Sequence, residues 1–303
     1  MRSLLLLLLM LCSLHVSRAQ AQTDTVNTTV LNKRKLHTAI ATSAGFYAAG
    51  ISYLRFVWYK DHERVPFHYY NDAAGYLQID KFGHAWGAYL ESYIGYHWLR
   101  SAGLSRNKSL VWGGGLGFIL QAPIEVFDGM YEGWGFSWSD MAANAAGSGI
   151  VIGNELLFKE QLVKYKFSFA PSPYREQAHG YLGDTALESL FLDYNAHTYW
   201  LSMPLKELLQ QRRLPPWLNL AAGYSANGMY GEFKNRSYYR GQAIPPAERY
   251  RQFLLSADVD WTRIPTNSRF LKTLFKGMVF IKLPFPALEV NSTGAFKLHG
   301  LYY

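Results

Sequence analysis

Residues 137–147 read Ser137-Trp138-Ser139-Asp140-Met141-Ala142-Ala143-Asn144-Ala145-Ala146-Gly147. Asp140, Asn144 and Gly147 recur at the spacing of one face of an α-helix, in a run that is otherwise apolar or small. A helix that confines its polar residues to one stripe turns that stripe toward the interior or toward a cavity. We therefore predict a helix over residues 138–159 whose polar stripe points inward.

Two further stretches repeat this arrangement of polar residues on one helical face. The first begins Asp80-Lys81-Phe82-Gly83-His84, and the second spans residues 121–128. The polar faces of these two stretches carry Asp80, His84 and Glu91, and Gln121, Glu125 and Asp128. Because the three stripes lie close in sequence, we expect them to converge on one site.

The N-terminal half of the chain is expected to be a bundle of about four helices. Helical patterns cover residues 36–59, 80–100, 108–127 and 138–159. Each is about as long as the roughly 20 residues that cross a hydrocarbon core. Their many small residues let helices approach closely, and Gly113-Gly114-Gly115 with Pro123 predicts a kink in the third helix.

Beyond Pro171-Ser172-Pro173 the pattern changes from helical periodicity to alternation. Strands are predicted at residues 197–203, 218–226, 252–262, 278–283 and 295–302, and short helices at 205–211 and 270–275. Asn227-Gly228 predicts a tight hairpin turn. The fold class is therefore α+β, with the helical bundle followed by an antiparallel sheet of about five or six strands.

Residues 1–21 have the pattern of a secretory signal peptide: a basic Arg2, an apolar run, and a small-residue cleavage site at Ala19-Gln20-Ala21. The only cysteine, Cys12, lies inside this signal and lacks small residues before it. We therefore expect a cleaved, exported chain without lipid or disulfide. A polar leader at 22–35, a helical domain at 36–167 and a strand-rich domain at 174–303 complete the predicted organisation.

The overall composition favours a membrane surface as partner. The 303 residues carry a formal charge of +8, and 49% of them are hydrophobic. Export and the absence of a long basic run argue against nucleic acid, so an anionic lipid surface is the expected partner. With 22 Tyr and 9 Trp, the chain is also rich in the residues that suit membrane interfaces. We expect a membrane-associated protein of the periplasm or outer membrane, and its protein partners stay open.

A small set of ionisable residues forms the candidate site: Asp80, His84, Glu125, Asp128 and Asp140. One histidine with several carboxylates can bind a divalent metal, for which the expected ligands are Asp80, His84, Glu125 and Asp128. The same residue types can do acid–base catalysis, for which the candidates are His84, Glu125, Asp128 and Asp140.

Simpler readings of these residues stay open. An acid in the first helical turn, such as Asp80 or Asp140, stabilises the helix dipole by roughly 0.3–1 kcal/mol. Asp80 and His84 also have the spacing of an ordinary ion pair on one helix, and all five residues can form a polar network without chemistry. The chain has no nucleophile elbow, phosphate loop, dinucleotide fingerprint or His-Glu-x-x-His motif.

The chain resembles the YfiM-type family of predicted periplasmic lipoproteins, a domain of unknown function. The resemblance covers roughly residues 76–160 and rests on Asp80-Lys81-x-x-His84, Glu125-x-x-Asp128, Gly135-Phe136-Ser137-Trp138-Ser139-Asp140 and Gly147. The strand-rich half is similar to longer members in Bacteroidetes through Asp193-Tyr194-Asn195 and Tyr199-Trp200-Leu201-Ser202. A looser likeness extends to VanZ-like membrane proteins. The resemblance implies an envelope protein and brings no known reaction.

Two functions follow from these patterns. The first is a membrane-associated structural or lipid-binding module in which the cluster holds the helices together or binds a lipid head group. The alternative is a hydrolase of lipid or another envelope substrate, dependent on a metal or on acid–base chemistry at His84, Glu125, Asp128 and Asp140.

Overall fold

The computed structural model describes residues 30–303 and has the predicted α+β class. The described chain forms two compact units. The helical unit contains residues 30–73 and 84–161, and the sheet unit contains residues 74–83 and 162–303. The division falls inside one helix, between Gly83 and His84. The predicted signal peptide and Cys12 lie outside the described residues.

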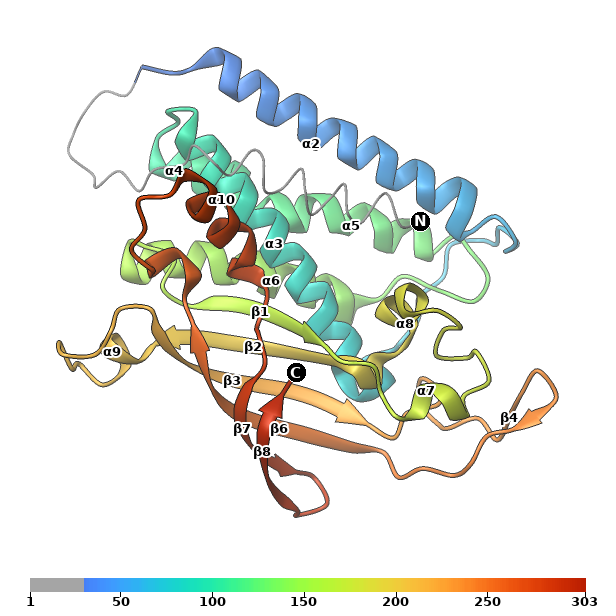
Figure 1. The fold of residues 1–303 in the computed structure, drawn as a ribbon. Coiled ribbons are helices and arrows are strands. Elements are labelled where there is room, and N and C mark those ends of the chain that lie inside the picture. The colour runs from blue at the N-terminus through green and yellow to red at the C-terminus, as the bar shows by residue number, and fades with distance from the viewer. Residues whose placement is uncertain (1–29) are drawn as a thin grey trace. The chain divides into compact units, whose positions relative to one another are not determined.

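The helical unit is built from the four predicted helical segments (Figure 1). Their observed bounds are α2 Lys33–Tyr53 with the π-helical turn η2 Leu54–Trp58, α3 Ile79–Ser101, α4 Arg106–Ser109 with the π-helical turn η4 Leu110–Gly114, α5 Leu116–Asp128, and α6 Trp138–Phe158. Gly115 separates η4 from α5, so the glycine run interrupts the third predicted helix. Pro123 lies inside α5 without ending it.

Side-chain caps fix where these helices begin. Asn32 accepts a hydrogen bond from the Lys35 amide at the start of α2, and Ser137 accepts one from the Asp140 amide at the start of α6. These bonds satisfy amides that have no partner inside the helix. Helix α6 ends at Lys159, whose left-handed backbone breaks the helical path.

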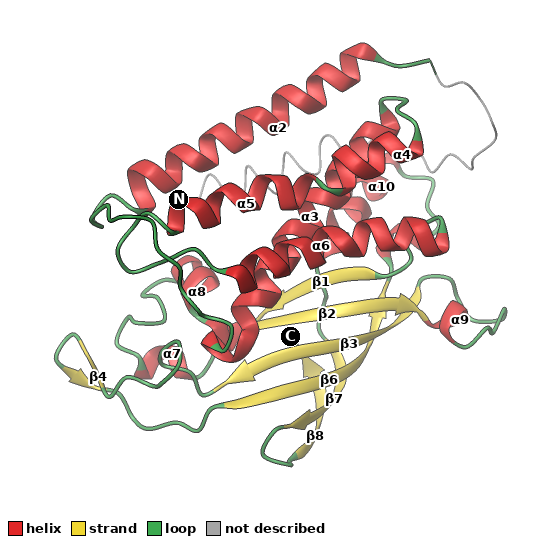
Figure 2. Cartoon of the chain, turned by 180° about the vertical axis from the view of Figure 1, so that it is seen from behind, coloured by secondary structure: helices red, strands yellow, loops and turns green. Residues whose placement is uncertain are grey.

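The sheet unit is organised around six antiparallel strands in the order β1-β2-β3-β6-β7-β8 (Figure 2). The strands are β1 Lys164–Phe169, β2 His197–Pro204, β3 Leu218–Asn227, β6 Tyr250–Val259, β7 Phe285–Asn291 and β8 Phe296–Tyr302, and a separate pair contains β4 Tyr238–Tyr239 and β5 Gln242–Ala243. The short helical segments of this unit are η3 Gly75–Gln78, α7 Tyr174–Gln177, α8 Ala186–Leu192, η5 Tyr194–Ala196, α9 Leu205–Leu208, η6 Trp261–Arg263, α10 Arg269–Gly277 and η7 Met278–Phe280.

Two details of the predicted sheet were wrong. Residues 278–283 were expected to be a strand, but Met278–Phe280 forms a 3₁₀ turn and the strand β7 begins only at Phe285, after Pro284. Pro284 has no amide hydrogen to donate to a ladder, and Pro286 of β7 falls at a break in the register between Phe285 and Ala287. Strand β1 was not predicted at all.

The hairpin predicted at Asn227-Gly228 was also wrong. Asn227 pairs with Tyr250, so the connection is a long loop and not a two-residue turn. The side-chain amide of Asn235 holds this loop by donating to the carbonyls of Gly228 and Ala247. These bonds replace the backbone pairing of a tight hairpin.

The two faces of the sheet have opposite chemistry. Along β6, Ser256 and Asp258 are buried, whereas Phe253 is 53% and Leu255 43% exposed. The buried face contains the ion pair between Lys166 Nζ and Asp258 Oδ2, 2.6 Å apart. Burial lowers the pKa of Lys166, and the carboxylate of Asp258 opposes that shift. The interior face of the sheet therefore carries polar side chains beside a small apolar cluster of Trp200, Ala221, Leu254 and Ala287.

Three consecutive residues before α3 adopt a left-handed backbone. The φ angles of Tyr76, Leu77 and Gln78 are 44°, 51° and 69°. Each such residue costs about 1–2 kcal/mol, because its Cβ crowds the following carbonyl. Three hydrogen bonds within the sheet unit hold the turn. The Tyr76 amide donates to the Glu232 carbonyl, and the Tyr224 hydroxyl donates to the Leu77 carbonyl. The Arg251 guanidinium donates to Gln78 Oε1.

Candidate functional site

Close packing of α3, α5 and α6 forms the frame of the site in the helical unit. A methyl group at Gly147 of α6 would collide with the carbonyl of Ala85 on α3. A methyl group at Gly117 of α5 would collide with the carbonyl of Ala88. Glycine at these positions therefore lets the helix backbones touch.

A pair of buried serines joins the same three helices. The hydroxyls of Ser92 on α3 and Ser148 on α6 lie 2.9 Å apart. Ser92 also accepts a hydrogen bond from the Gly117 amide, and Ser148 accepts one from the Phe118 amide. Both amides belong to the first turn of α5, where no partner exists within the helix. The serines thus cap α5 from two neighbouring helices.

The sequence-predicted residues His84, Glu125 and Asp140 meet within this frame. The Nδ1 atom of His84 lies 3.5 Å from Glu125 Oε1, and its Nε2 atom lies 3.7 Å from Asp140 Oδ1. Both carboxylates are buried, and the imidazole side chain is 23% exposed. Each ring nitrogen therefore faces a different carboxylate.

The other two predicted site residues, Asp80 and Asp128, also have partners outside this trio. Asp80 lies in the sheet unit, one helical turn before His84 on α3, where it pairs with Lys81 Nζ at 2.9 Å and accepts a hydrogen bond from the Tyr194 hydroxyl. Asp128, in the last turn of α5, accepts a hydrogen bond from the hydroxyl of Tyr59. Burial raises the pKa of the Tyr59 hydroxyl, and the nearby Asp128 carboxylate raises it further.

Asn144 is a further residue of the α6 stripe with an unusual environment. It is fully buried, and among the described residues neither its amide nitrogen nor its carbonyl oxygen has a hydrogen-bond partner. It lies one helical turn after Asp140 and one before Gly147, which contacts α3. A buried amide without partners costs roughly 1–3 kcal/mol, so this side chain has capacity for a ligand.

Asp72 supports the start of α6 and was not predicted from the sequence. Its Oδ1 atom accepts hydrogen bonds from the hydroxyls of Ser137 and Ser139, at 2.6 and 2.7 Å. Ser137 in turn caps the Asp140 amide at 3.1 Å. This chain of bonds fixes the first turn of α6, and therefore the position of the Asp140 carboxylate. The sequence signal was weak, because Asp72 is 65 residues from Ser137.

A second polar contact lies further along α3. Gln121 Nε2 donates to Glu91 Oε2 at 3.1 Å, so the polar faces of α3 and α5 meet as their spacing predicts. Burial raises the pKa of Glu91 to about 8, and the hydrogen bond from Gln121 opposes this shift.

The arrangement around His84 can support two kinds of chemistry. A histidine that ligates a metal usually donates its other ring N–H to a carboxylate, which fixes the ring orientation. Glu125 and Asp140 place one carboxylate beside each nitrogen, so either can orient the ring while the opposite side binds a cation. The same geometry lets a carboxylate orient His84 as a general base.

Residues 68–154 match the family model described as a predicted periplasmic lipoprotein (DUF2279). The match contains all five sequence-predicted site residues and supports the resemblance drawn from their motifs. It also supports an exported, periplasmic, membrane-associated location. No curated protein and no solved structure matches the chain.

Proposed function

We propose that this protein is a membrane-associated component of the cell envelope whose apolar outer surfaces contact lipid. The observation that carries the proposal is an inverted distribution of polarity, which recurs in each unit. Many polar side chains are buried in each unit, and many large apolar side chains are exposed.

In the helical unit, the interior holds many polar side chains beside buried aromatic ones. Its buried polar side chains include Ser92, Glu125, Asp140, Asn144, Ser148, Asn154 and Glu155. Its exposed apolar side chains include Ile40, Phe46, Phe56, Val111, Trp112, Ile119, Val126, Leu156 and Leu157. Among the described residues, one segment, Arg106–Asp128, is long and apolar enough to cross a membrane, and only 28% of its most apolar window is buried.

The sheet unit repeats the pattern on strands. Cross-strand pairs place Phe253 with Val290, and Leu255 with Leu288, on the outer face of β6 and β7. Leu288 also pairs with Leu298 of β8, so the exposed apolar face continues across three strands. On the inner face, Glu289 accepts a hydrogen bond from His299 at 2.7 Å. Apolar residues outside and polar residues inside are typical of lipid-facing sheets.

Helix α10 adds a feature of interfacial helices. Phe270 is 73% exposed, and Leu274 follows one turn later on the same face. Three other positions of the helix carry the basic residues Arg269, Lys272 and Lys276. A short helix with an apolar face and basic flanks suits the boundary between head groups and acyl chains. Contiguous exposed apolar surface of this kind is rare on soluble monomers.

Fluorescence quenching by lipid tests this proposal. We expect brominated acyl chains in phosphatidylcholine vesicles to quench the tryptophan emission of the full-length protein. The variant Trp112→Phe removes an exposed ring and should reduce the quenched fraction, whereas Trp200→Phe removes a buried one and should not. Emission that is unchanged by brominated lipid would overturn the proposal.

A second candidate function is a divalent-metal or acid–base site at His84 that acts on an envelope substrate. The specific observation in its favour is Asn144, a buried amide without partners, one helical turn from Asp140. Amide oxygens, imidazole nitrogens and carboxylates are all common metal ligands. In this proposal His84 and Asp140 bind the cation, and Glu125 orients the ring.

Elemental analysis of the purified full-length protein separates this candidate from a purely structural cluster. We expect about one divalent ion per chain, lost in His84→Ala and in Asp140→Asn. Glu91→Gln is the matched control, because it changes a half-buried carboxyl on the same helix away from His84. The metal site is wrong if the native chain takes up no divalent ion after incubation with zinc, manganese and magnesium.

A further inference from the structure

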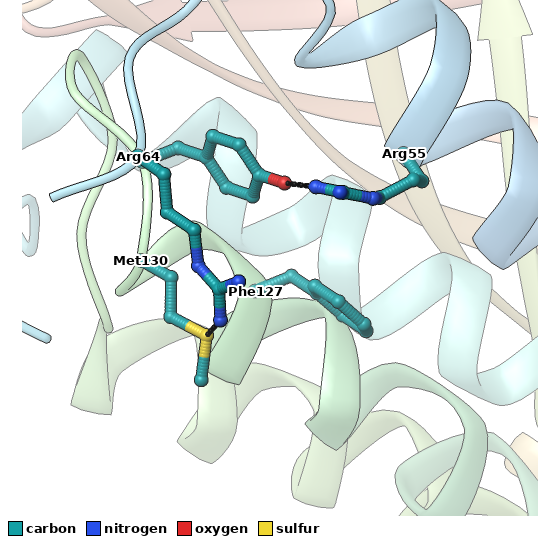
Figure 3. Close-up of a pocket in the computed structure, with 5 residues that line it drawn as sticks. Arg55, Arg64, Phe127 and Met130 are labelled. Atoms are coloured by element: carbon teal, nitrogen blue, oxygen red, sulfur yellow. Dashed lines mark hydrogen bonds between the residues drawn. The ribbon is translucent and has the colours of Figure 1, made fainter.

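A small pocket with two arginines lies in the helical unit, apart from the His84 cluster. It has a volume of about 220 Å³ and is lined by Arg55, Arg64, Phe127, Met130 and Tyr131. Arg55 reaches it from η2 at the end of α2, and Arg64 from the loop that follows (Figure 3). Phe127 and Met130, at the end of α5 and just beyond, supply an apolar wall.

The two guanidinium groups keep most of their hydrogen-bonding capacity. Arg55 Nη1 donates to the Tyr131 hydroxyl at 2.6 Å, and Arg64 Nη2 approaches the Met130 sulfur at 3.6 Å. Within residues 30–303, neither arginine forms an ion pair with a carboxylate. A guanidinium carries five N–H donors, so both groups can bind an anion from outside.

Three other arginines differ in this respect. Arg106 pairs with Glu155, Arg240 with Asp184, and Arg263 with Asp260. Two arginines that share one pocket without a carboxylate repel each other, and a bound anion would remove that repulsion. The arrangement is therefore unfavourable without an anion and favourable with one.

The back of the pocket is rigid. Tyr131 is buried, and its ring stacks on Tyr59 with centroids 4.2 Å apart and an angle of 6° between the planes. The backbone of Tyr131 also forms a strand-like bridge with Arg64. The Tyr59 hydroxyl donates to Asp128, so the acid next to Phe127 has a partner of its own. A fixed wall lowers the entropy cost of binding.

We propose that this pocket binds a phosphate group. Arginine forks match the tetrahedral oxygens of phosphate and donate two parallel hydrogen bonds to it. The pocket is smaller than the roughly 300–1,000 Å³ of sites that enclose a whole organic ligand, so it suits a head group. Phe127 and Met130 then contact the carbon chain next to the phosphate. A phospholipid as the source rests on the proposed membrane association, and free phosphate is the other source.

The test compares vesicle binding of the full-length protein with its arginine variants. The vesicles contain phosphatidylcholine alone, phosphatidylcholine with phosphatidic acid, or phosphatidylcholine with cholesteryl hemisuccinate, which adds charge without phosphate. We expect Arg55→Gln with Arg64→Gln to weaken the preference for phosphatidic acid by about tenfold or more. Arg34→Gln is the matched control, since it removes one exposed arginine from α2 outside the pocket.

Two further comparisons identify the source and the geometry. Arg64→Lys keeps the charge and loses the fork, so it should behave like Arg64→Gln if two parallel bonds matter. A titration with inorganic phosphate, followed by ³¹P NMR, tests whether the pocket binds free phosphate. Binding broadens the phosphate line, and this broadening should disappear in the double variant. Such broadening without a preference for phosphatidic acid vesicles would support the pocket with free phosphate as its ligand.

The outcomes separate this inference from the proposed function. Equal weakening by Arg34→Gln, or equal binding to cholesteryl hemisuccinate, would mean diffuse charge attraction and would overturn the pocket. If the protein does not bind vesicles of pure phosphatidylcholine, the proposed membrane association loses support. The phosphate pocket is then tested by the ³¹P NMR titration with inorganic phosphate. Both arginines are exposed, so the variants are expected to melt like the native chain, and thermal melting checks this.

Discussion

The Lys166 network of the sheet unit and Asn144 of the helical unit are both buried, but their polar groups are satisfied differently. In the sheet unit, Lys166 pairs with Asp258 at 2.6 Å and also donates to the Val259 carbonyl. Ser202 donates to the same carboxylate and accepts a hydrogen bond from Asn219. In the helical unit, Asn144 is just as deeply buried and has no partner among the described residues.

This difference distinguishes a structural network from a candidate binding site. A buried ion pair whose members also hydrogen-bond to neighbours serves the fold, because removing one partner leaves the other charge uncompensated. A buried amide with no partner weakens the fold unless something binds to it. The sheet unit should therefore lose stability when its polar interior is altered, and the helical unit should lose binding.

The largest effect is expected from breaking the ion pair in the sheet. Lys166→Met should lower the free energy of unfolding by about 3–5 kcal/mol, because it leaves Asp258 buried without its cation. Adding Asp258→Leu should recover much of this loss. Chemical denaturation of the full-length protein measures both values, combined in a double-mutant cycle.

An exposed ion pair is the control for this prediction. Arg240 and Asp184 lie 3.0 Å apart with side chains more than half exposed, so Arg240→Met should leave the melting temperature unchanged. If Lys166→Met behaves like Arg240→Met, the polar interior of the sheet does not stabilise it, and the contrast between the units disappears.

The next effect concerns pH and is confined to the sheet unit. Burial lowers the pKa of His197 from 6.5 to about 4, and a hydrogen bond to the Leu190 carbonyl opposes the shift. The unfolded chain binds a proton near pH 6.5 and the folded chain does not, so stability falls as pH drops from 6.5 to 4. The loss is about 3 kcal/mol.

Replacing His197 by glutamine checks the origin of this pH dependence. His197→Gln retains a side-chain donor for the Leu190 carbonyl but cannot be protonated in this range. Denaturation at several pH values should give a flatter profile for the variant between pH 6.5 and 4. An identical slope in both proteins would assign the pH dependence to other groups.

A matched pair of glycine substitutions tests the packing of the helical unit. Gly147→Ala places a methyl group against the Ala85 carbonyl and should lower stability by about 1–3 kcal/mol. Gly149→Ala, on the same helix with open space around it, should raise stability by up to about 1 kcal/mol. Thermal melting measures both, and equal shifts would mean that α3 and α6 do not need close contact.

The smallest effect is expected at Asn144. Asn144→Leu removes the unpartnered amide while keeping a similar volume, so stability should rise by roughly 1 kcal/mol. The variant should also lose any divalent ion that the native chain retains. A clear loss of stability would instead show that Asn144 stabilises the fold through its contacts. The polar residues in the interior of the helical unit would then serve the fold, as those of the sheet unit do.

The sequence predicted the elements of the fold better than their connections. Helical periodicity located the four helical segments to within a few residues, and three of them carry a polar stripe on one face. Strand β1 escaped prediction because Lys164 and Lys166 occupy its buried face. Lysine is expected on the outer face of a strand, and only a distant partner such as Asp258 makes burial tolerable.

For the site, helical spacing brought the right faces together but did not determine partners. The i, i+4 pattern predicted that Asp140 and Asn144 share a face, and the structure places Asp140 beside His84. The helical spacing contained no signal that Tyr59 would hydrogen-bond to Asp128, or that Asp72 would hold the start of α6. These contacts join segments far apart in sequence, which local periodicity does not record.

The left-handed turn at Tyr76–Gln78 has a consequence for the order of folding. Its partners Tyr224 and Arg251 lie 147 and 173 residues further along the chain. Contacts of such separation close late, because the loop entropy must be offset before they form. A chain that crosses a membrane N-terminus first therefore exposes this turn before its partners arrive. The start of α3 is expected to reach its final conformation only after β3 and β6 have paired.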